Sequence, residues 1–168
     1  GAFLEGAQSL VSKVIPKATE QEQLNALRNG MKYAASLGIT SAQNANGNVE
    51  EYNLYKKLLD MNELTMRFSL GFNVGLKTTE NDIADFIKIK NETQNSPWLK
   101  GHAIKFMVDG VIESHTAVML DPYSDIPVND RAQKKNWNIP PQKYKELVVK
   151  LDSAGFQLYT HAIGDLGV

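Results

Sequence analysis

Residues 102–110 read HAIKFMVDG, and residues 156–165 read FQLYTHAIGD. Each segment has the short apolar run that is typical of a strand in a buried sheet. Each also carries one nitrogen-bearing side chain, Lys105 in the first and His161 in the second. If the two strands are neighbours in a parallel sheet, both side chains reach one site, where a lysine needs a partner or a chemical modification to offset its burial. The two segments therefore predict an α/β fold with a site where both strands end.

Helix and strand signals alternate from Thr19 onward. The first helix starts with a capping box, in which Thr19 and Glu22 satisfy each other's free backbone donors, and Gly38 suits its end. Alternation of this kind predicts a parallel sheet with right-handed crossovers. Further helices are expected at residues 49–61, 79–93 and 140–155, strands at residues 39–43, 64–72, 102–110 and 156–161, and a polar loop at residues 44–48.

The length of the chain limits the size of the sheet. A complete (β/α)8 barrel needs about 250 residues, whereas this chain has 168. We therefore expect a partial TIM barrel of about four parallel strands that alternate with helices. The alternative is a small open sheet, but the Gly-rich phosphate turn expected after its first strand is absent from the sequence. Residues 1–18 are expected to form an irregular lead-in, and residues 19–168 the β/α units of one domain.

Composition excludes several classes of partner. The hydrophobic fraction of 42% and the charged fraction of 22% are those of a globular domain. A net charge of −1 favours neither nucleic acid nor an anionic membrane surface, and no apolar run is long enough to span a bilayer. Because the sequence has no cysteine, a metal would have to be held by His, by a carboxylate or by a less usual ligand. We expect a small-molecule substrate, and no nucleic-acid or membrane partner.

Two interpretations are open for each of the two strand residues. His161 lies at the carboxyl end of its strand, so it is either a metal ligand or a core histidine bonded to a neighbouring carbonyl. Lys105 faces opposite to Ile104 and Phe106, and it is either a site residue or an exposed lysine that protects an edge strand. The dense polar run that follows Lys105 favours the site.

Polar residues near the strand ends are candidates for substrate contacts or for the support of a ligand. Asp109 lies next to the end of the first segment, and Glu113 and His115 follow it closely. His115 contacts either substrate or solvent. Asp165 either orients the imidazole of its own strand or caps a following helix. His102, at the amino end of the first segment, is expected to be structural.

Several stretches of the chain carry a family resemblance. In their order along the chain they resemble the YtcJ-like branch of the amidohydrolase superfamily, and together they cover nearly all of the sequence. The stretches are residues 104–117 (IKFMVDGVIESHTA), 33–41 (YAASLGITS), 151–156 (LDSAGF) and 161–165 (HAIGD), with 3–7 (FLEGA) and 15–16 (IP).

The resemblance implies a (β/α)8 barrel with one or two divalent metals, zinc being the expected ion. The metals activate a water that hydrolyses C–N bonds other than peptide bonds, in a small amide-type substrate. Lys105 would lie on the fourth strand as the bridging ligand, carboxylated by CO2, a reaction that needs the neutral amine and is therefore favoured by burial. His161 would lie on the fifth strand as a second ligand. Asp109, Glu113, His115 and Asp165 would contact substrate or support the ligands.

The chain also departs from the family pattern. The His-x-His pair of the first strand is missing, and the eighth-strand aspartate that acts as general base is expected beyond Val168, so the chain holds no catalytic residue of its own. Asn44 stands where relatives often have an aspartate. The chain is therefore expected to be a central fragment, strands two to five, of a larger enzyme. Its location, cytoplasmic or periplasmic, is left open because any signal peptide would precede Gly1.

Ligand counting predicts how the isolated chain behaves. A catalytic zinc typically needs three protein ligands, and Lys105 and His161 supply two. We expect weak or absent metal binding, an uncarboxylated Lys105 and no catalysis, together with self-association through open sheet edges. The alternative is a self-contained α/β binding or interaction domain without catalysis.

Overall fold

The computed structural model describes residues 5–127 and 137–168. Its sheet has four strands, β1 (Ser41–Gly47), β2 (Arg67–Val74), β3 (Leu99–Met107) and β4 (Gln157–His161). The strands lie in the order of the sequence, and each is parallel to its neighbours. This confirms the predicted α/β architecture of parallel strands alternating with helices.

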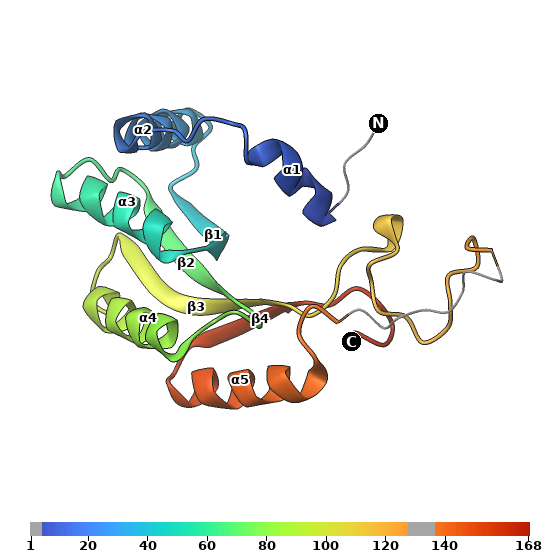
Figure 1. Ribbon diagram of the computed structural model, residues 1–168. Helices are drawn as coiled ribbons and strands as arrows, with labels where there is room; N and C mark the ends of the chain where they lie inside the picture. The colour runs from blue at the N-terminus through green and yellow to red at the C-terminus, as the bar shows by residue number, and fades with distance from the viewer. Residues whose placement is uncertain (1–4, 128–136) are drawn as a thin grey trace.

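Helices connect the strands, and three of them cover one face of the sheet (Figure 1). The helices are α1 (Ser9–Ser12), α2 (Glu20–Ser36), α3 (Val49–Asp60), α4 (Glu80–Thr93) and α5 (Pro141–Ser153), with short 3-10 turns at η1 (Glu5–Gln8) and η2 (Ile112–Ser114). Figure 1 shows α3, α4 and α5 on one side of the strands, and α1 standing off on the other side. The side of the sheet that α3, α4 and α5 leave uncovered is called the open face below. In the described ranges, no helix is long and apolar enough to cross a membrane.

Capping boxes mark the start of two of the helices. The predicted capping box is present at the start of α2, where the Thr19 hydroxyl accepts from the Glu22 amide and the Glu22 carboxylate accepts from the Thr19 amide. A second box, between Thr79 and Asp82, starts α4. The chain leaves α5 through Gly155, whose φ of +75° is unfavourable for residues with a side chain.

The core lies between the sheet and the helices. The rings of Phe72 (β2) and Phe86 (α4) stack with centres 4.5 Å apart, and Phe106 (β3) meets Tyr144 (α5) edge-on at 5.1 Å. Phe72 and Phe106 are both fully buried. Burying a side chain of this size contributes about 1.5–3 kcal/mol to the stability of the folded state, so these rings stabilise the packing of α4 and α5 on the central strands.

An irregularity in β3 determines which of its side chains reach the open face. Ser69 pairs with Lys100, but Gly71, two residues on, pairs with Ala103, so β3 has one extra residue there. A bulge of this kind reverses the alternation of faces. After it, Ile104 and Phe106 are buried against the helices, and Lys105 lies on the open face.

The first strand differs from its prediction. The polar run from Asn44 to Gly47 was expected to be a loop, but it belongs to β1 and continues the pairing with β2, Asn44 opposite Leu70 and Gly47 opposite Phe72. The residues of β1 are mostly exposed, so their polar composition costs little. Backbone pairing with β2 decides where β1 ends, and amino-acid composition does not show this pairing.

Two smaller expectations are also corrected. Within the lead-in of residues 1–18, predicted to be irregular, residues Glu5–Ser12 form short helical turns. His102, expected at the start of its strand, lies inside β3 because β3 begins at Leu99. Pairing of Leu99 with Phe68 of β2 carries the strand back past His102. The sequence also predicts a polar loop at residues 121–138, of which residues 128–136 lie outside the described residues.

Candidate metal centre

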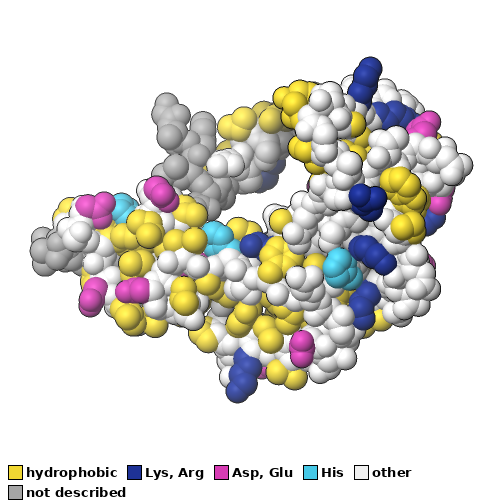
Figure 2. Space-filling view, turned by 180° about the vertical axis from the view of Figure 1, so that it is seen from behind, with side chains coloured by type: hydrophobic (Ala, Val, Ile, Leu, Met, Phe, Trp, Pro, Cys, Tyr) yellow, Lys and Arg dark blue, Asp and Glu magenta, His cyan; other side chains and the backbone are white. Residues whose placement is uncertain are grey.

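The carboxyl ends of β3 and β4 lie side by side. In their parallel register Lys105 is opposite Tyr159, and Met107 is opposite His161. Lys105 and His161 therefore share the open face, with His161 two positions nearer the carboxyl end. Figure 2 shows the molecule from behind, with a hollow between the sheet and the segment that contains α1. The sequence prediction that two neighbouring parallel strands carry these side chains agrees with this register.

Lys105 is half-buried on a central strand. Because β3 lies between β2 and β4, the interpretation of Lys105 as a lysine that protects a sheet edge does not apply. Its Nζ lies 5.2 Å from the centre of the Tyr159 ring, over the face of the ring. An ammonium group is attracted to the face of an aromatic ring at this distance. The lysine therefore has an aromatic neighbour on the open face.

Tyr159 is a site residue that the sequence did not single out. Its hydroxyl donates a hydrogen bond to the Ala45 carbonyl of β1, so the side chain crosses the open face from β4 to the first strand. On the way it passes over Gly71 of β2, which has no side chain to obstruct it. Burial raises the pKa of the Tyr159 phenol. A glycine inside a strand often marks such a close approach, and Gly71 was the available signal.

His161 is held by the loop that follows β3. Its Nε2 lies 2.8 Å from the Gly110 carbonyl oxygen. A carbonyl can only accept a hydrogen bond, so Nε2 carries the proton and Nδ1 of the neutral ring keeps its lone pair. Metal-binding histidines commonly donate their second ring N–H in this manner. A hydrogen bond to a backbone carbonyl is expected of a core histidine, and a metal-binding histidine makes the same bond.

Asp109 is buried between the loops that follow β3 and β4. None of its surface is exposed, and its carboxylate accepts hydrogen bonds from the amides of Val118 (3.1 Å), Ile163 (3.1 Å) and Gly164 (2.8 Å). These donors come from the loops after β3 and β4. The structure therefore directs this carboxylate toward the backbone of two loops.

The remaining candidates lie on loops beyond the strand ends. Asp165 accepts a hydrogen bond of 2.7 Å from the Leu120 amide, and Glu113 is exposed on η2. His115, in a left-handed backbone conformation, pairs through Nε2 with Asp125 at 2.9 Å. That hydrogen bond lowers the pKa of the Asp125 carboxyl. The contacts found for these side chains join loop residues to one another and do not reach Lys105 or His161.

The donor set on the open face fits part of a metal site. In residues 5–127 and 137–168, no group of three or more His, Asp or Glu side chains is arranged to hold a metal ion. Lys105 and the Nδ1 side of His161 remain as a pair on adjacent strands. A carboxylated lysine and an imidazole are suitable ligands for a divalent ion such as zinc, but two ligands are fewer than a catalytic zinc usually has.

Comparison with protein families places the whole chain in one group. Residues 1–168 match the family model described as Amidohydrolase family. The Protein LONG AFTER FAR-RED 3 of Arabidopsis thaliana is 26% identical over 98% of this chain, and the YtcJ protein of Bacillus subtilis is 23% identical over 99%. The chain spans 29% and 30% of the length of these two relatives.

Solved structures agree on the fold. Two uncharacterized metal-dependent hydrolases, from Pyrococcus horikoshii and Pyrococcus furiosus, each match with a TM-score of 0.65 over 96% of this chain. Their sequence identities are 16% and 15%, and the match covers 31% and 32% of their chains. The predicted partial TIM-barrel fold is thus confirmed, and the numbering of the strands as two to five stays a prediction.

Proposed function

Since the chain belongs to the amidohydrolase family, we propose that it is part of a metal-dependent hydrolase that cleaves C–N bonds other than peptide bonds. The observation that carries the proposal is the register of β3 and β4, which puts Lys105 and His161 on one face at neighbouring strand ends. In parallel α/β folds this edge of the sheet is where catalytic side chains gather. The proposed substrate is a small amide-type molecule.

Each of the two residues has a defined part in this proposal. Lys105, carboxylated by CO2, would present carboxylate oxygens to one or two divalent ions, and zinc is the ion that we propose. His161 would present Nδ1, because its Nε2 proton is committed to Gly110. When bound, a divalent ion polarises the scissile group and lowers the pKa of a bound water. The other ligands and the general base are expected in the part of such proteins that these 168 residues do not cover.

For the 168-residue chain alone we propose a different state. With two of the usual three or more ligands, it binds metal weakly, keeps Lys105 unmodified and does not catalyse hydrolysis. Within the described sheet, β1 and β4 each have one unpaired edge, and the open face has no helix of α3, α4 or α5 on it. Unpaired edges are templates for pairing with another chain, so we propose that the isolated chain self-associates.

The experiment uses the protein encoded by the full open reading frame that contains this sequence. It compares the metal content of wild type and variants, and their hydrolysis of N-acyl and N-formyl amides. Lys105→Ala is the test variant, and Lys100→Ala is the matched control, because Lys100 is on the same strand and its Nζ bonds the Gln94 carbonyl. Loss of metal and activity in Lys105→Ala alone is expected. A metal-free wild type, or a Lys105→Ala variant that keeps its metal, would favour the alternative of a binding domain without catalysis.

A further inference from the structure

We infer that Asp109 is a positioning residue for His161. Through the loop that follows β3, its buried carboxylate holds the Gly110 carbonyl in the place where that carbonyl fixes the His161 ring. The ring then presents Nδ1, the nitrogen that a metal would bind. Asp109 has this role for a metal only if His161 is a ligand, as the proposed function requires.

The Asp109 carboxylate joins two loops. Its Oδ2 accepts from the amides of Val118 (3.1 Å) and Gly164 (2.8 Å), and its Oδ1 accepts from the amide of Ile163 (3.1 Å). A fully buried carboxylate is costly unless donors satisfy its oxygens, and here backbone amides from both loops do so. The loops touch one another as well, since a methyl group on Gly164 would stand 2.0 Å from the Val118 carbonyl oxygen.

The peptide group between Asp109 and Gly110 is held on both sides. Its carbonyl oxygen accepts a 2.9 Å hydrogen bond from Asn138 Nδ2, and its amide donates to the Thr116 carbonyl at 3.0 Å. The Asp109 carboxylate anchors the far end of the same loop through Val118. The next carbonyl along the chain, that of Gly110, is therefore confined to the position from which it accepts the His161 Nε2 proton at 2.8 Å.

This arrangement determines the His161 tautomer. The neutral imidazole can carry its proton on either nitrogen, and the partner of one nitrogen decides which. If the Gly110 carbonyl moves, the Nε2–H tautomer loses its acceptor and the Nδ1–H tautomer becomes populated. A ring protonated on Nδ1 cannot bind a metal through that atom.

The test is the tautomer of His161, read from the nitrogen chemical shifts of the 15N-labelled chain at a pH where its imidazoles are neutral. The chain has three histidines, and His102→Gln and His115→Gln identify the other two signals. Asp109→Asn keeps the shape of the side chain but replaces one acceptor oxygen by a donor. Asp165→Asn is the control, because Asp165 also joins the two loops, through the Leu120 amide at 2.7 Å, but has no bond to the segment 109–110.

We expect His161 protonated on Nε2 in the wild type and in Asp165→Asn, and a rise of the Nδ1–H form in Asp109→Asn. If Asp109→Asn does not fold, Gly164→Ala, which forces the two loops apart while the carboxylate stays, is expected to show the same rise. A His161 that stays protonated on Nε2 in whichever of these variants folds would overturn the inference.

Zinc binding separates this inference from the proposed function. In the protein with its full reading frame, Asp109→Asn is expected to bind zinc about 10- to 100-fold more weakly, as is usual when support of a metal-binding histidine is lost. If neither protein binds zinc but the tautomer changes, the inference holds for the ring and the proposed function fails. If zinc binding needs Lys105 but neither affinity nor tautomer responds to Asp109→Asn, the inference fails and the proposed function remains.

Discussion

Tyr159 lies against Gly71 so closely that a methyl group on Gly71 would stand 2.0 Å from the tyrosine hydroxyl oxygen and 2.8 Å from Cζ. The two residues come from β4 and β2, with β3 between them. The absence of a side chain at Gly71 is what lets the Tyr159 hydroxyl reach the Ala45 carbonyl on β1. The ring that lies next to Lys105 is thus placed by a glycine two strands away.

Replacing Gly71 by Ala is therefore expected to displace Tyr159 and to lower the free energy of unfolding by about 1–3 kcal/mol, the usual cost of overpacking. Urea unfolding at one fixed protein concentration measures it. Gly75→Ala is the control, because a methyl group there meets no atom within 4 Å. Equal effects of the two substitutions would show that Tyr159 does not occupy this position.

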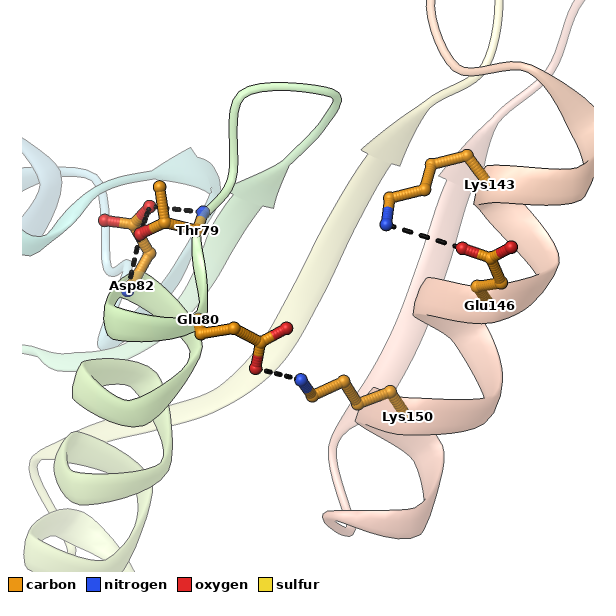
Figure 3. Close-up of polar contacts among 6 residues, drawn as sticks. All are labelled: Thr79, Glu80, Asp82, Lys143, Glu146 and Lys150. Carbon is orange, nitrogen blue, oxygen red and sulfur yellow. Dashed lines mark hydrogen bonds and ion pairs between the residues drawn. The ribbon is translucent and has the colours of Figure 1, made fainter.

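The capping box at the start of α4 predicts a pH dependence. Figure 3 shows Thr79 and Asp82 facing each other at this helix end. Hydrogen bonds from the Thr79 amide, and then from its hydroxyl, lower the pKa of the Asp82 carboxyl below its ordinary value of 3.8. A lowered pKa in the folded state adds stability that is present above the ordinary value and is lost as the pH falls through the folded value. In Asp82→Asn, the free energy of unfolding should depend less on pH in this range than in the wild type, as acid unfolding measures. Asp85→Asn, which removes a charge from the same helix, is the control and should change this pH dependence less.

The ion pair between Glu80 and Lys150 connects α4 to α5 (Figure 3). The side chains are 80% and 43% exposed, so water and salt screen the pair. A double-mutant cycle of Glu80→Gln and Lys150→Met is expected to give a coupling energy below about 1 kcal/mol that shrinks further in high salt. Lys143 and Glu146, 3.4 Å apart within α5, provide a local pair for comparison. A larger coupling that resists salt would mean that this contact is shielded from solvent.

Tyr52 should titrate at unusually high pH. Burial, reinforced by the negative charge of Glu92, raises its pKa to about 12. A raised pKa in the folded state gives stability that is present below the ordinary value of 10.0 and is lost as the pH rises toward 12. Following the ultraviolet absorbance of phenolate in wild type and in Tyr52→Phe should show one late-ionising group that the variant lacks. A Tyr52 that ionises near 10.0 would mean that its hydroxyl is open to solvent.

Self-association of the isolated chain should depend on its sheet edges. Sedimentation velocity over a range of concentrations is expected to show oligomers, and Gln43→Lys, which puts a charge on the exposed strand β1, is expected to weaken them. Asn95→Lys adds the same charge in the exposed segment after α4 and should have little effect. A chain that stays monomeric at high concentration would contradict the prediction.

Local signals in the sequence were reliable where neighbouring residues supply the interaction. The capping box of Thr19 and Glu22 starts α2, and α5 begins at Pro141, within the range predicted for its helix. Composition was misleading at Asn44, because pairing with Leu70 of β2 extends β1 through a polar run. Composition also does not show whether Lys105 is on an edge strand or an internal strand, because the order of the strands in the sheet decides this.

By itself, the sequence determined the alternation of helices and strands, the parallel architecture and the pair of candidate ligands, because periodicity, caps and strand-end motifs act over a few residues. Only the tertiary structure decided what those ligands touch. The Gly110 carbonyl on His161, the Tyr159 ring beside Lys105 and the two loops held by Asp109 all join segments that lie far apart in the chain or on different strands. Such contacts depend on strand register and on the bulge in β3, which are set by packing of the whole sheet and leave no local pattern in the sequence.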